Sequence, residues 1–320
     1  MNNWIPAELI NGQNDWLCRW LYAGDLPFTD PFFDETLLKC RRLSENAGRY
    51  RSAGSIPSLI EWAAALPSVP PSAFIFHISR CGSTLASQLL GLDPDHIVLA
   101  EVPFIDALLR LPYKTDAPAL PDIEHAVKAA IRFYGQQRTG RERRLFIKAD
   151  SWHIFFYRQL RLWYPGIPFI LLYRSPDEVL YSHRRRRGMQ AVPGLIEPAI
   201  LDIKEPQSLA GDLDGYLAKV LEGYLSKFLE VVQADNNAYL VNYSDGIPSI
   251  VEKIAILTNT VLSEKVRERM AHRSHYHAKY PGEVFSEPAP GVPPPPFLAG
   301  AMEAYGQLEK ISVRLPHYAV

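Results

Sequence analysis

Cysteine is scarce in this chain of 320 residues, which has only Cys18, Cys40 and Cys81. Their spacing matches neither a disulfide framework nor the ligand pattern of a zinc or iron–sulfur site. A disulfide-stabilised secreted domain is therefore excluded, and we expect a reducing compartment.

Long apolar runs and an excess of one charge are also missing. No stretch reaches the roughly 18 apolar residues that a membrane-spanning helix needs, and residues 1–4 do not begin a signal peptide. Lys and Arg number 34 against 35 Asp and Glu, a formal net charge of −1. Because no global field attracts nucleic acid or anionic membranes, any anion site must be a local patch. We expect a cytoplasmic protein.

The composition is that of a globular protein, with 47% hydrophobic and 22% charged residues. Residues 1–70 combine turn signals with aromatic residues at helical spacing, such as Trp16 and Trp20, and predict a helical N-terminal extension. Residues 71–287 predict an α/β domain. Residues 288–320 begin with a proline-rich stretch and predict an extended tail unless it packs on the domain.

Five short apolar runs predict strands that are buried on both faces: 74–78, 97–100, 145–147, 169–173 and 239–241. Amphipathic stretches separate the runs, as expected of strand–helix units around a parallel sheet. We therefore predict a three-layer α/β sandwich with a central, mostly parallel five-stranded sheet.

The sharpest motif joins the first predicted strand to the next helix, where residues 77–85 read His-Ile-Ser-Arg-Cys-Gly-Ser-Thr-Leu. A strand–loop–helix turn directs backbone N–H groups and the positive helix end toward one point, and Gly82 allows an anion to approach closely. The phosphate-binding loop of nucleotide hydrolases also requires an earlier glycine and a lysine, whereas Arg80 is the only cation here. The alternative is an ordinary strand–helix turn with a serine or threonine cap.

A second motif follows the fourth predicted strand. Ser175, Pro176 and Glu178 fit a helix start with a capping box. This places Arg174 at the carboxyl end of the strand and Ser182 about two turns into the helix, at the edge where open α/β sheets bind ligands. The alternative is a plain capping box with a solvated arginine. We interpret the arginine run at 184–187 as a solvated face.

Together the two motifs resemble those of the sulfotransferase superfamily, whose members bind 3′-phosphoadenosine 5′-phosphosulfate (PAPS). The resemblance spans about residues 72–285 and implies the phosphate-binding-loop fold of that superfamily. Cys81 takes the place of the usual serine. The resemblance implies that PAPS is bound by residues of both motifs: Arg80, Cys81, Gly82, Ser83, Thr84, Arg174 and Ser182.

Two strand-end residues complete the implied site. Lys148 matches the lysine that sulfotransferases place by the sulfate, and Glu101 matches the glutamate that tyrosylprotein and heparan-type members use as base. The resemblance implies that Lys148 stabilises the leaving group, while Glu101 takes the acceptor proton with a pKa raised toward neutrality. Two alternatives stay open: Glu101 caps a helix that begins near Pro103, or His153 is the base.

The Arg-Lys-Gly stretch of the cytosolic members is missing, and the basic segment 272–282 takes its place. Its basic residues, Lys279 among them, are expected to close over the nucleotide. The histidines of this segment alternate without a cysteine or carboxylate partner pattern, so we predict no metal.

We therefore predict an enzyme, a PAPS-dependent sulfotransferase that acts without metal on a hydroxyl or amine of a small molecule, saccharide or peptide. One rival is an ATP-dependent phosphotransferase, which needs a Gly-Lys-Ser/Thr loop that the sequence lacks. The other is a non-catalytic nucleotide- or partner-binding protein that presents its proline-rich tail.

Overall fold

The computed structural model describes residues 1–12, 15–48, 51–114, 118–120, 122–203, 211–280, 282–284, 291 and 293–314. Its centre is a five-stranded, fully parallel sheet in the order β5-β6-β4-β7-β8. The five predicted strands are confirmed with small differences at their ends: β4 (Pro71–His77), β5 (His96–Ala100), β6 (Arg144–Lys148), β7 (Phe169–Tyr173) and β8 (Ala238–Asn242).

Continuous apolar runs form these strands because both faces of the sheet are covered. Every residue of β7 is buried, and its Phe169 pairs with Phe74 of β4, their rings 5.5 Å apart. The chain builds β5 and β6 on one side of β4 and then β7 and β8 on the other. Such a change of side opens a crevice at the carboxyl end of the central strand, where ligands of open α/β sheets bind.

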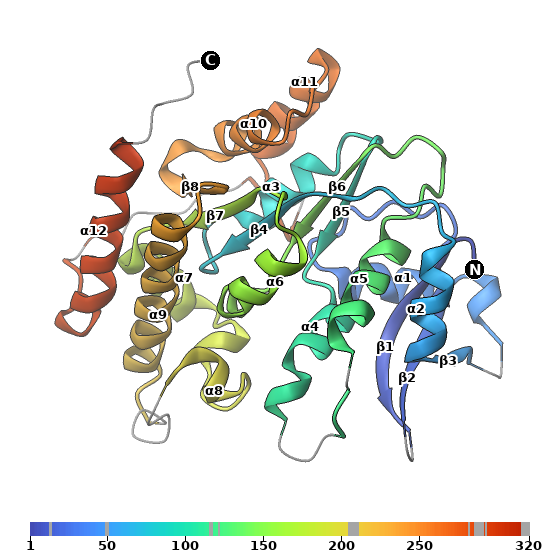
Figure 1. Cartoon of the computed structure of the whole chain (residues 1–320). Coiled ribbons are helices and arrows are strands. Elements are labelled where there is room, and N and C mark those ends of the chain that lie inside the picture. Colours follow the sequence, from blue (N-terminus) through green and yellow to red (C-terminus); the bar gives the residue numbers. More distant parts are fainter. Residues whose placement is uncertain are drawn as a thin grey trace.

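Helices cover both faces of the sheet, which makes three layers (Figure 1). Helix α3 contacts α10 and α11, and α9 contacts α7 and β8. None of the helices described has both the length and the apolar character needed to cross a bilayer. Their bounds are α3 (Ser83–Leu90), α4 (Pro103–Arg110), α5 (Ile123–Tyr134), α6 (Tyr157–Trp163), α7 (Pro176–Arg185), α8 (Pro198–Leu201), α9 (Leu213–Ala234), α10 (Ile247–Leu257) and α11 (Glu264–Ser274), with the 3₁₀ helix η3 (Ser151–Phe156).

The N-terminal extension is not purely helical, contrary to the prediction. A three-stranded antiparallel sheet carries it, with two helices: β1 (Trp4–Asn11), β2 (Trp16–Tyr22), α1 (Phe33–Cys40), β3 (Ala53–Ser55) and α2 (Ile56–Ala64). Trp16 and Trp20 are four residues apart, a spacing that puts two side chains on one face of a strand as well as of a helix. Residues 16–22 form a strand and not a helix, because β2 pairs with both β1 and β3.

The predicted C-terminal tail also differs from the expectation. Residues 299–314 form helix α12 (Ala299–Arg314), which packs against α9, as Figure 1 shows. Buried Leu298, Ala301, Ala304 and Leu308 recur every three or four residues, so one apolar stripe faces α9. Of the proline-rich stretch, residues 288–290 and 292 lie outside the described residues.

Candidate active site

The loop between β4 and α3 has the backbone of an anion-binding turn. Ser79, Arg80 and Gly82 have left-handed backbone, with φ of 72°, 50° and 77°. Left-handed residues in such a run turn successive N–H groups toward one concave surface. Helix α3 begins directly afterwards at Ser83 and adds its free N–H groups and the positive end of its dipole.

Gly82 is required by close packing as well as by its backbone angle. A Cβ at this position would overlap the Ile247 side chain and lie 2.8 Å from the Tyr243 ring. Both neighbours come from the far side of the sheet, from α10 and the end of β8. The loop is therefore held at a fixed distance from the rest of the site, and only glycine fits there.

Cys81 points away from the anion-binding face of the loop. Its thiol is fully buried and donates to the carbonyl oxygen of Leu172, 3.4 Å away. Burial raises the pKa of the Cys81 thiol to about 11, so the thiol stays protonated. Only the backbone of Cys81 is available to an anion, whereas Ser83 and Thr84 line the cavity described below.

Arg174 connects the second motif to the loop. Its Nη1 donates to the carbonyl oxygen of Arg80 at 3.0 Å, and its Nε donates to the carboxylate of Glu178 at 2.7 Å. The guanidinium lies over the Tyr243 ring, 4.2 Å from its centre, and the residue is 7% exposed. These contacts hold a cation at the carboxyl edge of the sheet, so Arg174 is not the solvated arginine of the alternative interpretation.

The predicted capping box at Ser175 does not form. The Ser175 hydroxyl donates to the Asp177 carboxylate, and no helix N–H bonds to its side chain. Glu178 turns to Arg174 instead of the cap. Glu178 pairs with Arg174 because a charge-assisted hydrogen bond to a guanidinium is stronger than a capping bond to a backbone N–H.

The arginine run at 184–187 is not simply a solvated face, contrary to our interpretation. Helix α7 ends at Arg185, and residues 185–187 line the cavity. The carbonyl oxygen of Arg186 accepts a hydrogen bond from the Arg80 guanidinium. Nη1 of Arg186 donates to the Tyr280 hydroxyl at 3.0 Å. The sequence pattern did not indicate these contacts, because α7 ends at Arg185, in the middle of the arginine run.

Lys279 also lines the cavity, in the segment that follows α11. Its ammonium lies 4.6 Å from the centre of the Phe32 ring, which the N-terminal extension supplies. Burial lowers the pKa of Lys279 to about 8, helped by the like charges of Arg80 and Arg186. An anion bound nearby would therefore stabilise the charged form of Lys279. Pro281, in the same predicted segment, lies outside the described residues.

The loop, α7 and the Lys279 segment enclose a cavity of about 880 Å³ with the ends of β5 and β6. Its volume is typical of a site for a nucleotide-sized ligand. Six cations line it, mostly from the β7 side of the sheet: Arg80, Arg174, Arg185, Arg186, Arg187 and Lys279. Four carboxyl groups line it from the β5 and β6 side and from the N-terminal extension: Asp34, Glu101, Asp106 and Asp150.

Glu101, Lys148 and His77 form one buried cluster at the ends of three adjacent strands. The Lys148 ammonium lies 2.6 Å from Glu101 Oε1, and His77 Nε2 lies 3.2 Å from the same oxygen. Lys148 is fully buried and does not itself line the cavity. His77 Nδ1 accepts the N–H of Ser79, so its proton is on Nε2 and points to Glu101.

The expected rise in the pKa of Glu101 is not found. Burial alone would raise it, but Lys148 and His77 outweigh burial and lower the pKa of Glu101 to about 2. The capping alternative is also contradicted, because no side chain caps α4 and its N-cap residue is Val102. Glu101 has a left-handed backbone, with φ of 58°, as is common at functional sites.

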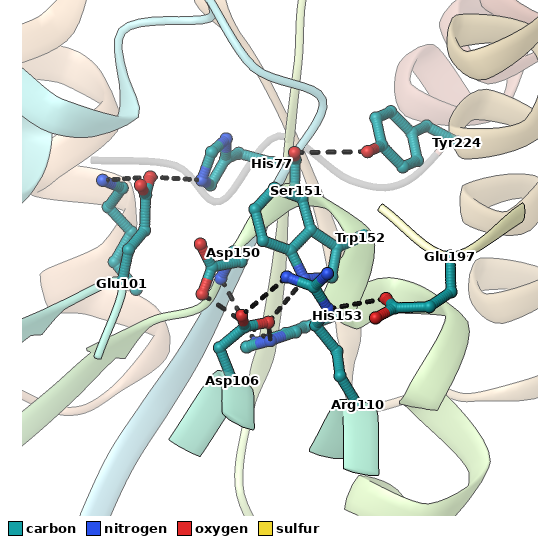
Figure 2. Close-up of polar contacts among 11 residues, drawn as sticks. His77, Glu101, Asp106, Arg110, Asp150, Ser151, Trp152, His153, Glu197 and Tyr224 are labelled. Carbon is teal, nitrogen blue, oxygen red and sulfur yellow. Dashed lines mark hydrogen bonds and ion pairs between the residues drawn. The ribbon is translucent and has the colours of Figure 1, made fainter. Parts of the chain in front are cut away.

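Asp106 organises a second cluster on the same side of the cavity (Figure 2). Its carboxylate accepts bonds from Trp152 Nε1 at 2.6 Å, His153 Nε2 at 2.9 Å and Arg110 Nη1 at 3.1 Å. Arg110 also donates to Glu197 at 2.7 Å. Burial opposes ionisation, but the three donors outweigh it and lower the pKa of Asp106.

Asp150 lies beside this cluster, two residues after the end of β6. Its backbone N–H donates to His153 Nδ1 at 3.3 Å, so both nitrogens of His153 are engaged. Ligand atoms of Asp106, Asp150 and His153 lie within 4.8 Å of one another, a spacing that would permit a metal ion. Those of Asp106 and His153, however, already have protein partners.

Sequence reasoning missed several residues that line the cavity. Asp150 could have been found, because it follows a predicted strand as Lys148 does and carboxyl ends of parallel strands share one edge. Asp106 and Trp152 lie in helical turns without a motif. Phe32 carried no signal, since its position in the site depends on how the N-terminal extension packs.

No family model and no curated protein sequence matches the chain. Among solved structures, it is similar to a sulfotransferase from Alicyclobacillus acidocaldarius, with 16% identity, a TM-score of 0.40, and 64% of this chain and 91% of that one covered. It is also similar to a sulfotransferase from Mycobacterium avium, with 15% identity, a TM-score of 0.47, and 87% of this chain and 84% of that one covered. A third similar structure is a sulfotransferase from Mycobacterium tuberculosis, with 14% identity, a TM-score of 0.42, and 68% of this chain and 75% of that one covered.

Proposed function

We propose that this protein is a sulfotransferase that moves a sulfuryl group from PAPS to a hydroxyl or amine acceptor. The observation that carries the proposal is the bond between Arg174 and the carbonyl of Arg80. It joins the β4–α3 loop to the end of β7, so both predicted motifs, from separate parts of the sequence, border one cavity. A donor with phosphate groups at both its 3′ and 5′ positions needs two such elements.

The residues of the two elements fit the two ends of the donor. The loop N–H groups, with Arg80, Ser83 and Thr84, would hold the 5′-phosphosulfate. Arg174 and Ser182 would hold the 3′-phosphate, and Lys279 adds a cation to the same cavity. PAPS supplies an activated sulfuryl group, so the protein needs to neutralise charge rather than supply a metal-bound nucleophile.

Lys148 keeps its predicted role as part of this proposal, and Glu101 is the proton acceptor that the sequence predicts. Lys148 would stabilise the leaving phosphate oxygen, and its ion pair with Glu101 must open or share the ammonium for that contact. Glu101 borders the cavity and remains a predicted proton acceptor. Its pKa of about 2 makes it a weak base in the free protein.

Calorimetry with the donor product, 3′-phosphoadenosine 5′-phosphate, tests the proposal. We expect binding in the low-micromolar range, about −8 kcal/mol, that a chelator does not change. Incubation with radiolabelled PAPS and a library of alcohols, phenols and amines then tests transfer. Tighter binding of ATP with Mg²⁺ than of the 3′-phosphorylated nucleotide would favour the phosphotransferase.

A further inference from the structure

Asp150 is placed to take part in proton transfer at the cavity wall. It follows β6 by two residues and lines the same cavity as the loop, while its side chain is only 10% exposed. Figure 2 shows its carboxyl group between Glu101 and the Asp106 cluster. The backbone N–H of His153 donates to the backbone carbonyl oxygen of Asp150 at 3.0 Å, and the Asp150 N–H donates to His153 Nδ1 at 3.3 Å. These bonds fix the backbone of Asp150 at the start of η3.

The other candidate bases of this region are occupied. Glu101 is engaged by Lys148 and His77. Asp106 accepts three bonds, and both nitrogens of His153 are used. A carboxylate or imidazole that already holds strong partners gives up binding energy before it can accept another proton.

Asp150 has no such strong partner. Among the residues that the structure describes, no lysine or arginine forms an ion pair with it, and the imidazole nitrogen His153 Nε2 lies 3.6 Å from its carboxyl oxygen. That nitrogen already donates to Asp106. Asp150 therefore has an oxygen available toward the cavity.

The surroundings also favour its protonated form. Burial is the largest cause that raises the pKa of Asp150 well above the usual range, and the charges of Glu101 and Asp106 add to it. Lys148 and Arg110 oppose the rise without cancelling it. The groups that face Asp150 are Glu101 after β5, Lys148 on β6, Asp106 and Arg110 on α4, His153 on η3 and Tyr224 on α9.

We propose that Asp150 is the residue that accepts the proton of the acceptor group, an inference that rests on the proposed sulfotransferase function. The acceptor oxygen or nitrogen forms a bond to sulfur, and the bond from sulfur to the phosphate oxygen of PAPS breaks. The acceptor proton moves to the ionised carboxylate of Asp150, and the nucleotide leaves with the electron pair. Asp150 then returns the proton to water. This assignment replaces Glu101, the proton acceptor predicted from the sequence, and leaves Glu101 the task of holding Lys148 in place.

Asp150→Asn separates basicity from structure, because asparagine has the size of aspartate and leaves the backbone bonds between residues 150 and 153 intact. We expect turnover to fall about 10²–10⁴-fold, with nucleotide affinity and melting temperature unchanged. Asp122→Asn is the matched control, since Asp122 also precedes a helix but is exposed and outside the cavity. It should leave turnover unchanged.

The pH profile distinguishes Asp150 from Glu101. With Asp150 as base, kcat/KM should rise with pH through a limb above the usual carboxyl range, and the limb should vanish in Asp150→Asn. With Glu101 as base, the profile stays flat down to acidic pH, and Glu101→Gln abolishes turnover. The second pattern, with full turnover in Asp150→Asn, overturns the assignment.

A direct titration gives a readout that does not need transfer activity. Carbon-13 NMR of aspartate-labelled protein, compared with Asp150→Asn, should show one carboxyl that titrates well above the ordinary range. A normal value for Asp150 overturns the inference. A wild-type protein that neither binds the nucleotide nor transfers sulfate overturns the proposed function, and this assignment with it.

Discussion

Arg174 donates a hydrogen bond from Nη1 to the carbonyl oxygen of Arg80, 3.0 Å away and 94 positions apart in sequence. Arg80 has left-handed backbone, and its carbonyl is turned toward the end of β7. The bond therefore ties the shape of the anion loop to a cation on another strand. Loss of this bond should therefore change both the shape of the loop and the position of the Arg174 guanidinium.

Arg174→Ala should weaken binding of 3′-phosphoadenosine 5′-phosphate by about 2–4 kcal/mol, the range for losing one partner of a desolvated charged contact. It also leaves the Arg80 carbonyl and Glu178 without their donor, so a modest loss of stability is expected. Calorimetry and thermal unfolding measure the two effects. Arg184→Ala is the control, because Arg184 pairs with Asp214 outside the cavity. Equal effects of both variants would contradict a binding role for Arg174.

Gly82→Ala should destabilise the protein and abolish nucleotide binding. An added Cβ overlaps Ile247, and the left-handed backbone adds about 1–2 kcal/mol. Gly140→Ala isolates the backbone cost, since Gly140 has φ of 78° but no atom within 4 Å of its added Cβ. Urea unfolding of both variants separates overlap from backbone strain. If Gly140→Ala lost as much stability as Gly82→Ala, close packing at Gly82 would not matter.

The Glu101–Lys148 ion pair should contribute to stability in a defined pH window. The pKa of Glu101 is lowered in the folded state to about 2 from 4.5, so its contribution is present above pH 4.5 and is lost as pH falls through about 2. Unfolding free energies of the wild type and of the Glu101→Gln variant should therefore converge in acid, where both leave the buried Lys148 without a counter-charge.

The single variants of this pair give the complementary test. Glu101→Gln alone leaves the fully buried Lys148 without a counter-charge and should cost about 3–5 kcal/mol. Adding Lys148→Met should recover much of that loss, because the uncompensated charge is removed. Additive losses in the double variant would show that the two groups do not interact.

Nucleotide affinity should fall as the pH rises past the pKa of Lys279. That pKa is about 8 in the free protein, so the ammonium that attracts an anion is lost above it. With one proton linked to binding, affinity should drop at most about tenfold per pH unit. Calorimetry at pH 7 and pH 9 should show this in the wild type and in Lys265→Met, an exposed control on α11, but not in Lys279→Met. If nucleotide affinity still falls with pH in Lys279→Met, another titrating group causes the pH dependence.

The predicted strands were confirmed because a strand buried on both faces leaves a local mark, a short continuous apolar run. The N-terminal extension was misread because the spacing of Trp16 and Trp20 fits two periods. Helix α12 was missed because the prolines before it dominated the interpretation, although its apolar stripe is present in the sequence.

The sequence by itself determined which residues end each parallel strand, and therefore that Arg80, Glu101, Lys148 and Arg174 gather at one edge of the sheet. Only the tertiary structure decided their partners. Lys148 reaches Glu101 because β5 and β6 are neighbours, and within the described part of the chain no lysine or arginine forms an ion pair with Asp150. Proton affinity depends on distances between side chains from different strands and on their burial, and neither quantity is encoded in local sequence spacing.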